Sequence, residues 1–415
     1  MSSVPIYPNS TSTKLFETIC LFEKPGKGTS YLIHMEPMME SIGMYLEILS
    51  LNSFPNEDID HFHVFAFTAG NYICYSYAFI NNDSLFSIVI VSSWRLPSLY
   101  FGFLTDSHKY FLEILDKSTP EWRFSLIHLS LCNWKFITRD VFHVEFITKS
   151  FDINTNSNID SFTQFNPFQY FSKSFPYLLV WKGLLCGKRI LVICEDPYKL
   201  SHAVFALASL TAPFPYMEDM LISLHPNDSR SKFCDNSTKL VGTTSALMVS
   251  TNTSYDYILI PSFSDTPNNE FYDDWSTRAG KLSQIVVHLS KMCFDDDPYR
   301  EFLGYNIFSP NVTKFISART KKSILNTIEL QLFEKSKTFQ EWFSNIRCRP
   351  EFRNAFLSID PDTYYKRFEK SDLDTRKKIC QEIQSHFIND KHMVSVIKHH
   401  INSIDQEIGI KMNVQ

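Results

Sequence analysis

The sequence predicts a multi-domain protein of mixed α+β and α/β class, and three stretches carry that prediction. Residues 15–115 contain predicted strands and helices in an order typical of an antiparallel sheet with helices. Residues 168–210 predict a helix, a buried strand and a second helix, which is typical of an α/β unit. Beyond residue 275 the apolar residues recur at helical spacing. We therefore expect a flexible tail at 1–13, an antiparallel-sheet domain at 14–118, a connecting segment at 119–166, a central α/β core at 167–275 and a helical module at 276–415.

The first domain shows the strand and turn signals of a five-stranded antiparallel sheet. β-branched and aromatic runs predict its strands, and Gly-containing stretches predict hairpin turns at 24–29 and 69–71. Apolar residues at helical spacing predict helices over 37–49 and 96–115. The predicted strands lie at 15–22, 31–35, 63–67, 72–80 and 85–91.

The connecting segment changes character along its length. Residues 126–136 and 141–148 alternate between apolar and polar side chains, as strands do. Residues 151–164 are rich in Asn, Ser and Asp, which favours a linker.

The central core begins with an apolar helical stripe. Gly187 stands where such a helix needs a left-handed residue to end it. Arg189–Ile193 is a β-branched run without alternation, which predicts a strand covered on both faces. A second periodic segment follows Pro197 and ends before Pro213. The stripe consists of Phe168, Phe171, Phe175, Leu178, Leu179 and Leu185.

The last third of the chain is expected to be entirely helical. The strongest stripe is Ile324, Ile328 and Leu332, spaced by four residues. The predicted helices cover 278–292, 323–334, 345–357, 374–388 and 393–404.

Composition excludes several classes of protein. Hydrophobic residues make up 44%, with 37 Phe and 19 Tyr, so we expect a globular chain. A net charge of -5 argues against nucleic acid as a partner, because phosphate binding requires a basic surface. The nine cysteines include no CxxC pair, which favours reduced, packed thiols and a cytoplasmic location. Neither a signal peptide nor a transmembrane run is evident.

No pattern in the sequence predicts covalent chemistry. The stretch from Gly183 to Arg189 superficially matches a phosphate loop, but it lacks the final Ser or Thr and precedes a strand instead of following one. None of the thirteen histidines belongs to a nucleophile motif, and no spacing indicates a metal site. We therefore expect a binding or regulatory protein that is not an enzyme and has no cofactor and no metal.

LLVWKGLLCGKRILVICEDP has the pattern of a helix followed by a buried strand, and LSHAVFALASLTAPFPYMEDMLISLHPNDSR that of a further helix with a Pro-containing exit. Both segments resemble the corresponding parts of the DENN-domain proteins, which are guanine nucleotide exchange factors for Rab GTPases. LVGTTSALMVSTNTSYDYIL is similar to a Gly-Val-Thr-Asn-Pro helix start and the following strand, with Thr243-Thr244-Ser245 in place of Thr-Asn-Pro. SFPNEDIDHFHVFAF, NYICYSYAFI and SLFSIVIVSSWRLPSLYFGF resemble the family's upstream longin lobe, and KSKTFQEWFSNIR a helix of the sixth DENN subfamily. The resemblance spans most of residues 15–350.

The resemblance implies an upstream longin lobe, a central DENN core and a helical downstream module. Such proteins grip the switch segments of a Rab-type GTPase between the first two parts and promote GDP release during vesicle trafficking. The implied location is the cytoplasm, with peripheral association with endosomal or other vesicle membranes. The candidate Rab-binding residues lie in loops between the lobes, where each could instead be a loop cap or a turn residue: Arg95, Asp228, Arg230, Thr243 and Thr244.

Two alternatives remain open at this point. One is a scaffold of the same fold that does not promote exchange and that pairs with another DENN-fold protein to tether or to stimulate GTP hydrolysis. A catalytic arginine supplied in trans would mark it, and Arg95 and Arg139 are the candidates. The other is a trafficking adaptor without any effect on GTPase turnover.

Overall fold

The computed structural model divides the chain into two compact units, Met1–Ala279 and Gly280–Gln415. The predicted tail at 1–13, and the predicted linker beyond Asn154, lie outside the described residues. The structure describes residues 15–26, 28–55, 62–81, 84–108, 111, 127–128, 131–132, 134–138, 141–146, 149–154, 170–172, 175–211, 214, 216–225, 227–228, 230, 238–247, 255–262, 325, 327–340, 357, 359–388 and 390–413.

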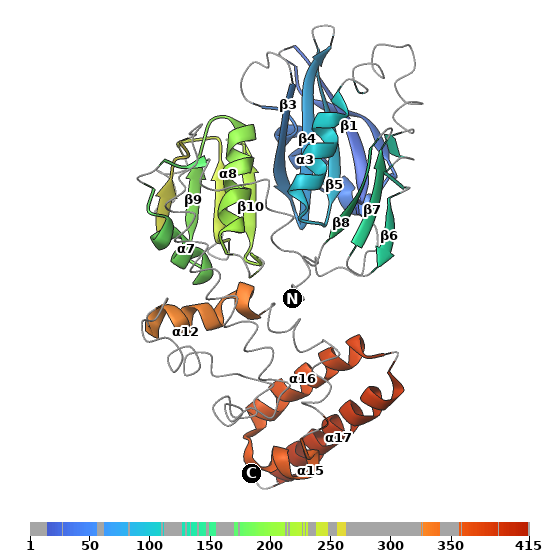
Figure 1. Ribbon diagram of the computed structural model, residues 1–415, viewed down its shortest axis with the longest axis vertical. Coiled ribbons are helices and arrows are strands. Elements are labelled where there is room, and N and C mark those ends of the chain that lie inside the picture. The colour runs from blue at the N-terminus through green and yellow to red at the C-terminus, as the bar shows by residue number, and fades with distance from the viewer. Residues whose placement is uncertain are drawn as a thin grey trace. The chain divides into compact units, whose positions relative to one another are not determined.

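The first unit contains the five-stranded antiparallel sheet that the sequence predicts (Figure 1). Its strand order is β2-β1-β5-β4-β3, so the two ends of the sheet are β2 and β3. Gly70, with φ of +58°, forms the tight turn between β3 and β4. The strands are β1 (Thr18–Pro25), β2 (Tyr31–Glu36), β3 (Phe62–Ala69), β4 (Tyr72–Asn81) and β5 (Ser84–Ser92).

Two short helices cover one face of this sheet where one helix over 37–49 was predicted. α1 (Glu40–Gly43) ends at Gly43, and α2 (Leu46–Asn52) begins three residues later. Glycine loses more backbone freedom in a helix than any other residue, which favours the break at Gly43. Ile42 and Leu49 are buried against Phe22 and Cys74 of the sheet.

α3 (Pro97–Asp106) begins with Pro97 in its first turn, where a missing N–H is tolerated. Tyr100 and Phe101 of this helix lie against Tyr75 of β4, with ring centroids 4.3 and 5.7 Å apart. Because Tyr75 and Cys74 are neighbours in the strand, they point to opposite faces, and α3 therefore covers the face opposite α2. α3 ends at Asp106, and residues 112–115 of the predicted helix lie outside the described residues.

A separate three-stranded antiparallel sheet follows, in the order β6-β7-β8. Its strands are β6 (Lys135–Thr138), β7 (Val141–Phe146) and β8 (Lys149–Asn154). The prediction of a linker from residue 151 is wrong for the first four positions, because Phe151 and Ile153 pair with Val144 and Phe142 of β7. The alternation of apolar and polar residues in this strand is short and lies in a stretch that is otherwise polar, so composition alone favoured a linker.

The central core contains a four-stranded sheet in which every pairing is parallel, in the order β10-β11-β9-β12. The four residues of β9 are buried, as a strand covered on both faces requires. Gly187 ends the preceding helix with φ of +65°, as predicted. The elements are α7 (Tyr177–Leu185), β9 (Ile190–Ile193), α8 (Pro197–Ser209), β10 (Met220–Leu224), β11 (Leu240–Thr243) and β12 (Tyr257–Leu259).

α7 begins at Tyr177, whereas the apolar stripe predicted a start near residue 168. Pro176 occupies the N-cap, because a proline inside the helix would clash with the preceding turn. Phe171 and Phe175 precede the helix and stack on each other, with ring centroids 4.2 Å apart. Their spacing matched a helix by coincidence.

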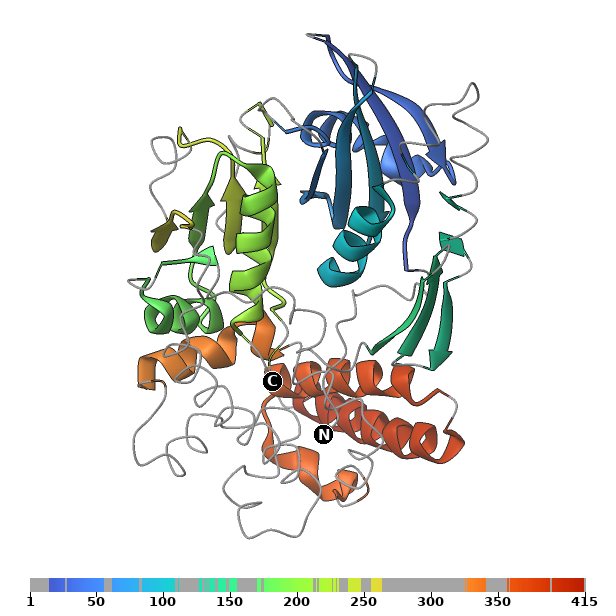
Figure 2. The same ribbon diagram turned by 45° about the horizontal axis from the view of Figure 1, so that its top comes forward.

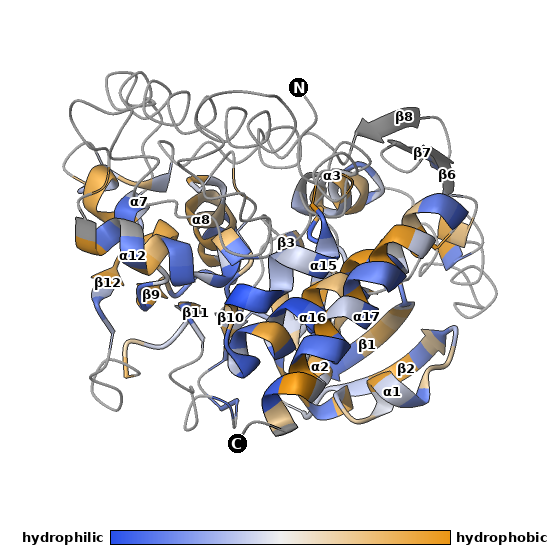
Figure 3. Ribbon diagram, turned by 90° about the horizontal axis from the view of Figure 1, so that it is seen from below, coloured by the Kyte–Doolittle hydropathy of each residue, from blue (hydrophilic) through white to orange (hydrophobic). Residues whose placement is uncertain are grey.

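The described elements of the second unit are all helical. α12 (Thr327–Lys335), α15 (Pro361–Tyr364) and a 3-10 turn (Tyr365–Arg367) precede the long helices α16 (Lys370–His386) and α17 (Lys391–Asn413). α16 and α17 pack against each other, and apolar and polar residues alternate along their ribbons (Figure 3). The predicted helix at 278–292, and all of that at 345–357 except Leu357, lie outside the described residues.

The described cysteines are all free thiols. Cys20, Cys74, Cys186 and Cys380 are buried, Cys194 is partly exposed and Cys132 is exposed. None of the described helices is both long and apolar enough to cross a membrane.

Candidate functional site at the junction of the two sheets

The antiparallel and parallel sheets of the first unit meet at their edges. β3 and β10 lie side by side, and α8 packs against both of them (Figures 1 and 2). The N–H of Ile222 in β10 donates to the Thr68 hydroxyl of β3 at 3.0 Å. Each edge strand therefore covers the other, which removes two edges that would otherwise be free to pair with another chain.

Asp228 lies just beyond β10 and joins the sheets through an ion pair. Its side chain is 1% exposed, and Arg230 Nη2 lies 2.6 Å from Asp228 Oδ2. Arg230 Nε also donates to Asp228 Oδ1 at 3.0 Å. The remaining guanidinium nitrogen, Nη1, donates to the Thr68 carbonyl oxygen at 2.6 Å. One arginine thus binds both a carboxylate of its own loop and the backbone of β3.

Asn52 completes this network from the C-terminal end of α2. Its amide Nδ2 donates to Asp228 Oδ2 and to the Ile48 carbonyl oxygen, each at 2.9 Å. Its Oδ1 accepts from the N–H of His225 at 3.1 Å. A buried amide that uses donors and acceptor together holds α2 at a defined position against the loop after β10.

The electrostatics of the network favour an ionised carboxylate. Burial alone would raise the pKa of Asp228, but the hydrogen bonds and charge of Arg230, with a further bond from Asn52, lower its pKa below the usual 3.8. Burial and the charge of Lys24 lower the pKa of His225, while Asp228 acts in the opposite direction. Near neutral pH, Asp228 and Arg230 are therefore both charged and are paired with each other.

Arg95 forms a second link, from the loop between β5 and α3. Its Nη1 donates to the carbonyl oxygen of Tyr216, which precedes β10. Burial lowers the pKa of Arg95 below its usual value, although Tyr216 and Asp219 oppose that shift.

Thr243 and Thr244 lie at the carboxyl end of β11. Thr243 is fully buried, and its Oγ1 donates to the Leu224 carbonyl oxygen at 3.2 Å while accepting from the N–H of Ser245 at 3.1 Å. The N–H of Thr244 also donates to Leu224 O, at 3.3 Å. The resemblance implied a helix start here, but Thr243 is the last residue of a strand because its backbone pairs with Ile193 of β9.

Arg95 and the Asp228–Arg230 pair therefore link the two lobes from opposite ends of β10. Thr243 and Thr244, at the end of β11, contact Leu224 of β10. Asp228 also caps its own turn, because Oδ1 accepts from the N–H of Arg230 at 2.9 Å. Direct contact of these residues with a partner stays a prediction. Arg139 lies outside the described residues.

Sequence reasoning missed Asn52 and Thr68. Asn52 lies 176 positions from Asp228, and nothing in its local pattern indicates that pairing. The only local signal is an asparagine at the end of an otherwise apolar helical run, a buried position that a polar side chain occupies only when it is hydrogen-bonded.

Aromatic side chains fill the rest of the junction. Phe205 of α8 lies parallel to Tyr75 of β4, with ring centroids 6.4 Å apart, and edge-on to Phe101 of α3. His202, one turn earlier in α8, is 8% exposed, and its Nδ1 donates to the Tyr198 carbonyl oxygen at 2.8 Å. Burial lowers the pKa of His202 to about 4.

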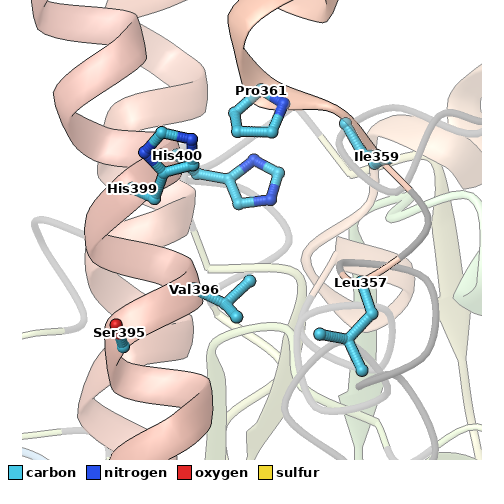
Figure 4. Close-up of a pocket in the computed structure, with 7 residues that line it drawn as sticks. All are labelled: Leu357, Ile359, Pro361, Ser395, Val396, His399 and His400. Atoms are coloured by element: carbon cyan, nitrogen blue, oxygen red, sulfur yellow. The ribbon is translucent and has the colours of Figure 1, made fainter.

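The second unit contains a pocket of about 330 Å³ beside α17 (Figure 4). Its wall is mostly aliphatic, and His400 in it is held by a 2.9 Å hydrogen bond between Nδ1 and the Tyr365 hydroxyl. The pocket is lined by Leu357, Ile359, Pro361, Ser395, Val396, His399 and His400. Among the residues that the structure describes, no cluster of His, Cys, Asp or Glu is arranged to hold a metal ion.

No protein-family model matches the sequence, and no curated protein matches it either.

Proposed function

We propose that the chain is a guanine nucleotide exchange factor for a Rab-type small GTPase and that its first unit consists of a longin lobe and a DENN core. The resemblance implies an antiparallel sheet with helices followed by an α/β core. A five-stranded antiparallel sheet followed by a four-stranded parallel sheet fits that order. The observation that carries the proposal is the buried Asp228–Arg230 pair, which ties the parallel sheet to Thr68 and Asn52 of the other lobe.

A rigid junction is what an exchange factor of this kind requires. Exchange involves no covalent step: the factor binds the nucleotide-free GTPase more tightly than the nucleotide-bound form. Displacing a switch segment weakens the binding of Mg²⁺ and GDP, and two lobes that already hold a fixed spacing spend less free energy on ordering when they bind the GTPase. On this proposal, Arg95, Asp228 and Arg230 act as positioning residues that keep two GTPase-binding lobes at that spacing.

The alternative in which Arg95 is supplied in trans to stimulate hydrolysis is less favoured. Arg95 donates to the Tyr216 carbonyl oxygen within its own chain and would first have to leave that contact. Peripheral association with vesicle membranes remains part of the proposal, because Rab-type GTPases act there.

The test is release of a fluorescent GDP analogue from a panel of Rab-type GTPases in the presence of the full chain. We expect release from at least one member to accelerate by about tenfold or more, since coupling free energies of 1–3 kcal/mol correspond to factors of about 5–150. Acceleration of GTP hydrolysis without GDP release would favour the paired-activator alternative. No effect on GDP release or on GTP hydrolysis across the panel would contradict the proposal and would favour the alternative of a trafficking adaptor.

A matched pair of variants tests the role of the junction in a GTPase that responds. Arg230→Gln removes the ion pair to the buried Asp228, whereas Lys188→Gln removes an ion pair to Asp256, whose side chain is 36% exposed. We expect Arg230→Gln to slow exchange and Lys188→Gln to leave it unchanged. Equal rates in both variants would show that the junction does not position the lobes for exchange.

A further inference from the structure

Two methionines in the antiparallel-sheet lobe point away from the core that their neighbours fill. Met38 is 83% exposed and lies two residues before α1, and Met44 is 74% exposed and directly follows α1. By contrast, Ile42 is 1% exposed and Leu49 is fully buried. Met39 and Leu46, like these two, pack against the core of the sheet. Other apolar residues of this segment therefore pack against the sheet, whereas the side chains of Met38 and Met44 face solvent.

The stretch of sequence that contains these methionines is acidic. Between Lys27 and Arg95 the sequence contains no lysine and no arginine. Glu40 and Glu47 are exposed on α1 and α2, and neither forms an ion pair with another described residue. The acidic residues of this stretch are Glu36, Glu40, Glu47, Glu57, Asp58, Asp60 and Asp83.

The segment that carries the two methionines is fixed by contacts with the rest of the first unit. Asn52 ties the C-terminal end of α2 to Asp228, and the Ser30 and Ser50 hydroxyls hydrogen-bond at 2.7 Å, which joins α2 to the chain before β2. Tyr45, next to Met44, packs so closely on the turn between β3 and β4 that a Cβ at Gly70 would collide with its ring. α1 and α2 lie beside β2 in Figure 3. A surface held in this way loses little conformational entropy when it binds a partner.

We propose that this surface, defined as Met38, Glu40, Met44 and Glu47, binds a protein segment that presents apolar side chains flanked by lysine or arginine. Methionine is unbranched and flexible, so exposed methionines adapt to apolar anchors of different shape. The carboxylates select basic neighbours of those anchors and disfavour acidic ones. The same charge disfavours an anionic bilayer or a nucleic acid as the occupant. This inference does not depend on exchange activity.

The experiment uses a synthetic helical peptide of Leu and Lys at amphipathic spacing, about 18 residues long so that it is helical in water. A peptide with Glu in place of each Lys is the control ligand. In the full chain labelled with ¹³C at the methionine methyls, we expect the Leu/Lys peptide to shift the Met38 and Met44 signals. The signals of Met393, which is fully buried, and Met412, which is 56% exposed in the other unit, should not move.

Variants then separate the apolar and the electrostatic parts. We expect Met38→Ser with Met44→Ser to weaken binding of the Leu/Lys peptide by about tenfold or more, as loss of an apolar anchor does. Glu40→Gln with Glu47→Gln should weaken it and flatten its dependence on salt. Met412→Ser and Glu382→Gln are the matched controls and should leave binding unchanged. Because all of these side chains are exposed, the variants should keep the native circular dichroism spectrum.

The inference would be overturned if the peptide shifted the signals of methionines outside the surface as much as those of Met38 and Met44. It would also be overturned if Met412→Ser or Glu382→Gln weakened peptide binding as much as the surface variants do. Binding of the Leu/Glu peptide as tight as that of the Leu/Lys peptide would contradict it as well.

Discussion

The imidazole of His202 lies flat against the ring of Phe101, with the ring centroids 4.7 Å apart and the ring planes 10° apart. His202 belongs to α8 of the parallel-sheet core, and Phe101 belongs to α3 of the antiparallel-sheet lobe. Tyr198, one turn before His202 in α8, lies against the same imidazole, with centroids 4.2 Å apart. The contact is therefore an aromatic one between the lobes, and one of its two rings is titratable.

This arrangement predicts a loss of stability in mild acid. Burial lowers the pKa of His202 from 6.5 to about 4, so between these values the unfolded chain takes up a proton that the folded chain does not. The free energy of unfolding should fall by about 3 kcal/mol as the pH drops from 6.5 to 4, with no further loss from this group below that. His202→Phe keeps an aromatic ring on Phe101 and should remove this part of the slope. Urea unfolding at a series of pH values measures it, and an unchanged slope in His202→Phe would contradict the prediction.

The Asp228–Arg230 pair predicts a second effect on stability. Arg230→Gln leaves a carboxylate that is 1% exposed without its cation, and we expect the free energy of unfolding to fall by about 2–4 kcal/mol. Lys188→Gln breaks an exposed pair and should cost less than about 1 kcal/mol. Because the pKa of Asp228 is lowered on folding, the pair stabilises the fold above pH 3.8 and ceases to do so as the pH falls below it. Urea unfolding at pH 7 and pH 3 should show a gap between the variants at pH 7 that shrinks at pH 3; a gap of the same size at both would contradict this assignment.

The N-cap of α8 predicts a smaller effect. Asp196 Oδ1 accepts from the N–H groups of Tyr198 and Lys199, at 2.9 and 3.3 Å. Asp196→Ala should lower the free energy of unfolding by about 1 kcal/mol, because two N–H groups of the first turn lose their acceptor. Asp196→Asn keeps an acceptor and should cost much less in the same thermal or urea unfolding experiment. Equal losses in both variants would show that the cap does not act through these bonds.

The five strands of the antiparallel sheet and β9 were predictable because their signals are local, whereas the strand predicted over 126–136 is helical at 127–128 and 131–132. The four residues of β9 form an unbroken apolar run, and Gly187 before it adopts the left-handed conformation that its position predicted. Helix limits were less predictable, since the breaks at Gly43 and Pro176 depend on single residues inside an otherwise periodic pattern. At β8 the polar composition led to the wrong prediction of a linker, although the apolar Phe151 and Ile153 occupy alternate positions there and pair with β7.

The candidate site was predictable only in part. Arg95, Asp228 and Arg230 were singled out from the resemblance, which implied that loops between the two lobes bind a partner, and that role stays a prediction. Their partners within the fold could not be predicted, since Asn52 and Thr68 come from elements that only the tertiary fold brings next to the loop after β10. No periodicity in a single sequence encodes such a pairing.

Replacing Gly242 of β11 and Gly102 of α3 by alanine should change the free energy of unfolding in opposite directions. A Cβ there would collide with the Ile222 carbonyl oxygen and lie 2.9 Å from a methyl of Val204, whereas a Cβ at Gly102 in α3 would meet nothing within 4 Å. Gly242→Ala should therefore lower the free energy of unfolding by about 1–3 kcal/mol, because β11 must move away from β10 or α8. Gly102→Ala should raise it by up to about 1 kcal/mol, because alanine loses less backbone freedom than glycine in a helix. Thermal unfolding of the two variants decides the point, and a loss in Gly102→Ala as large as that in Gly242→Ala would contradict the close approach of β10 and α8 to Gly242.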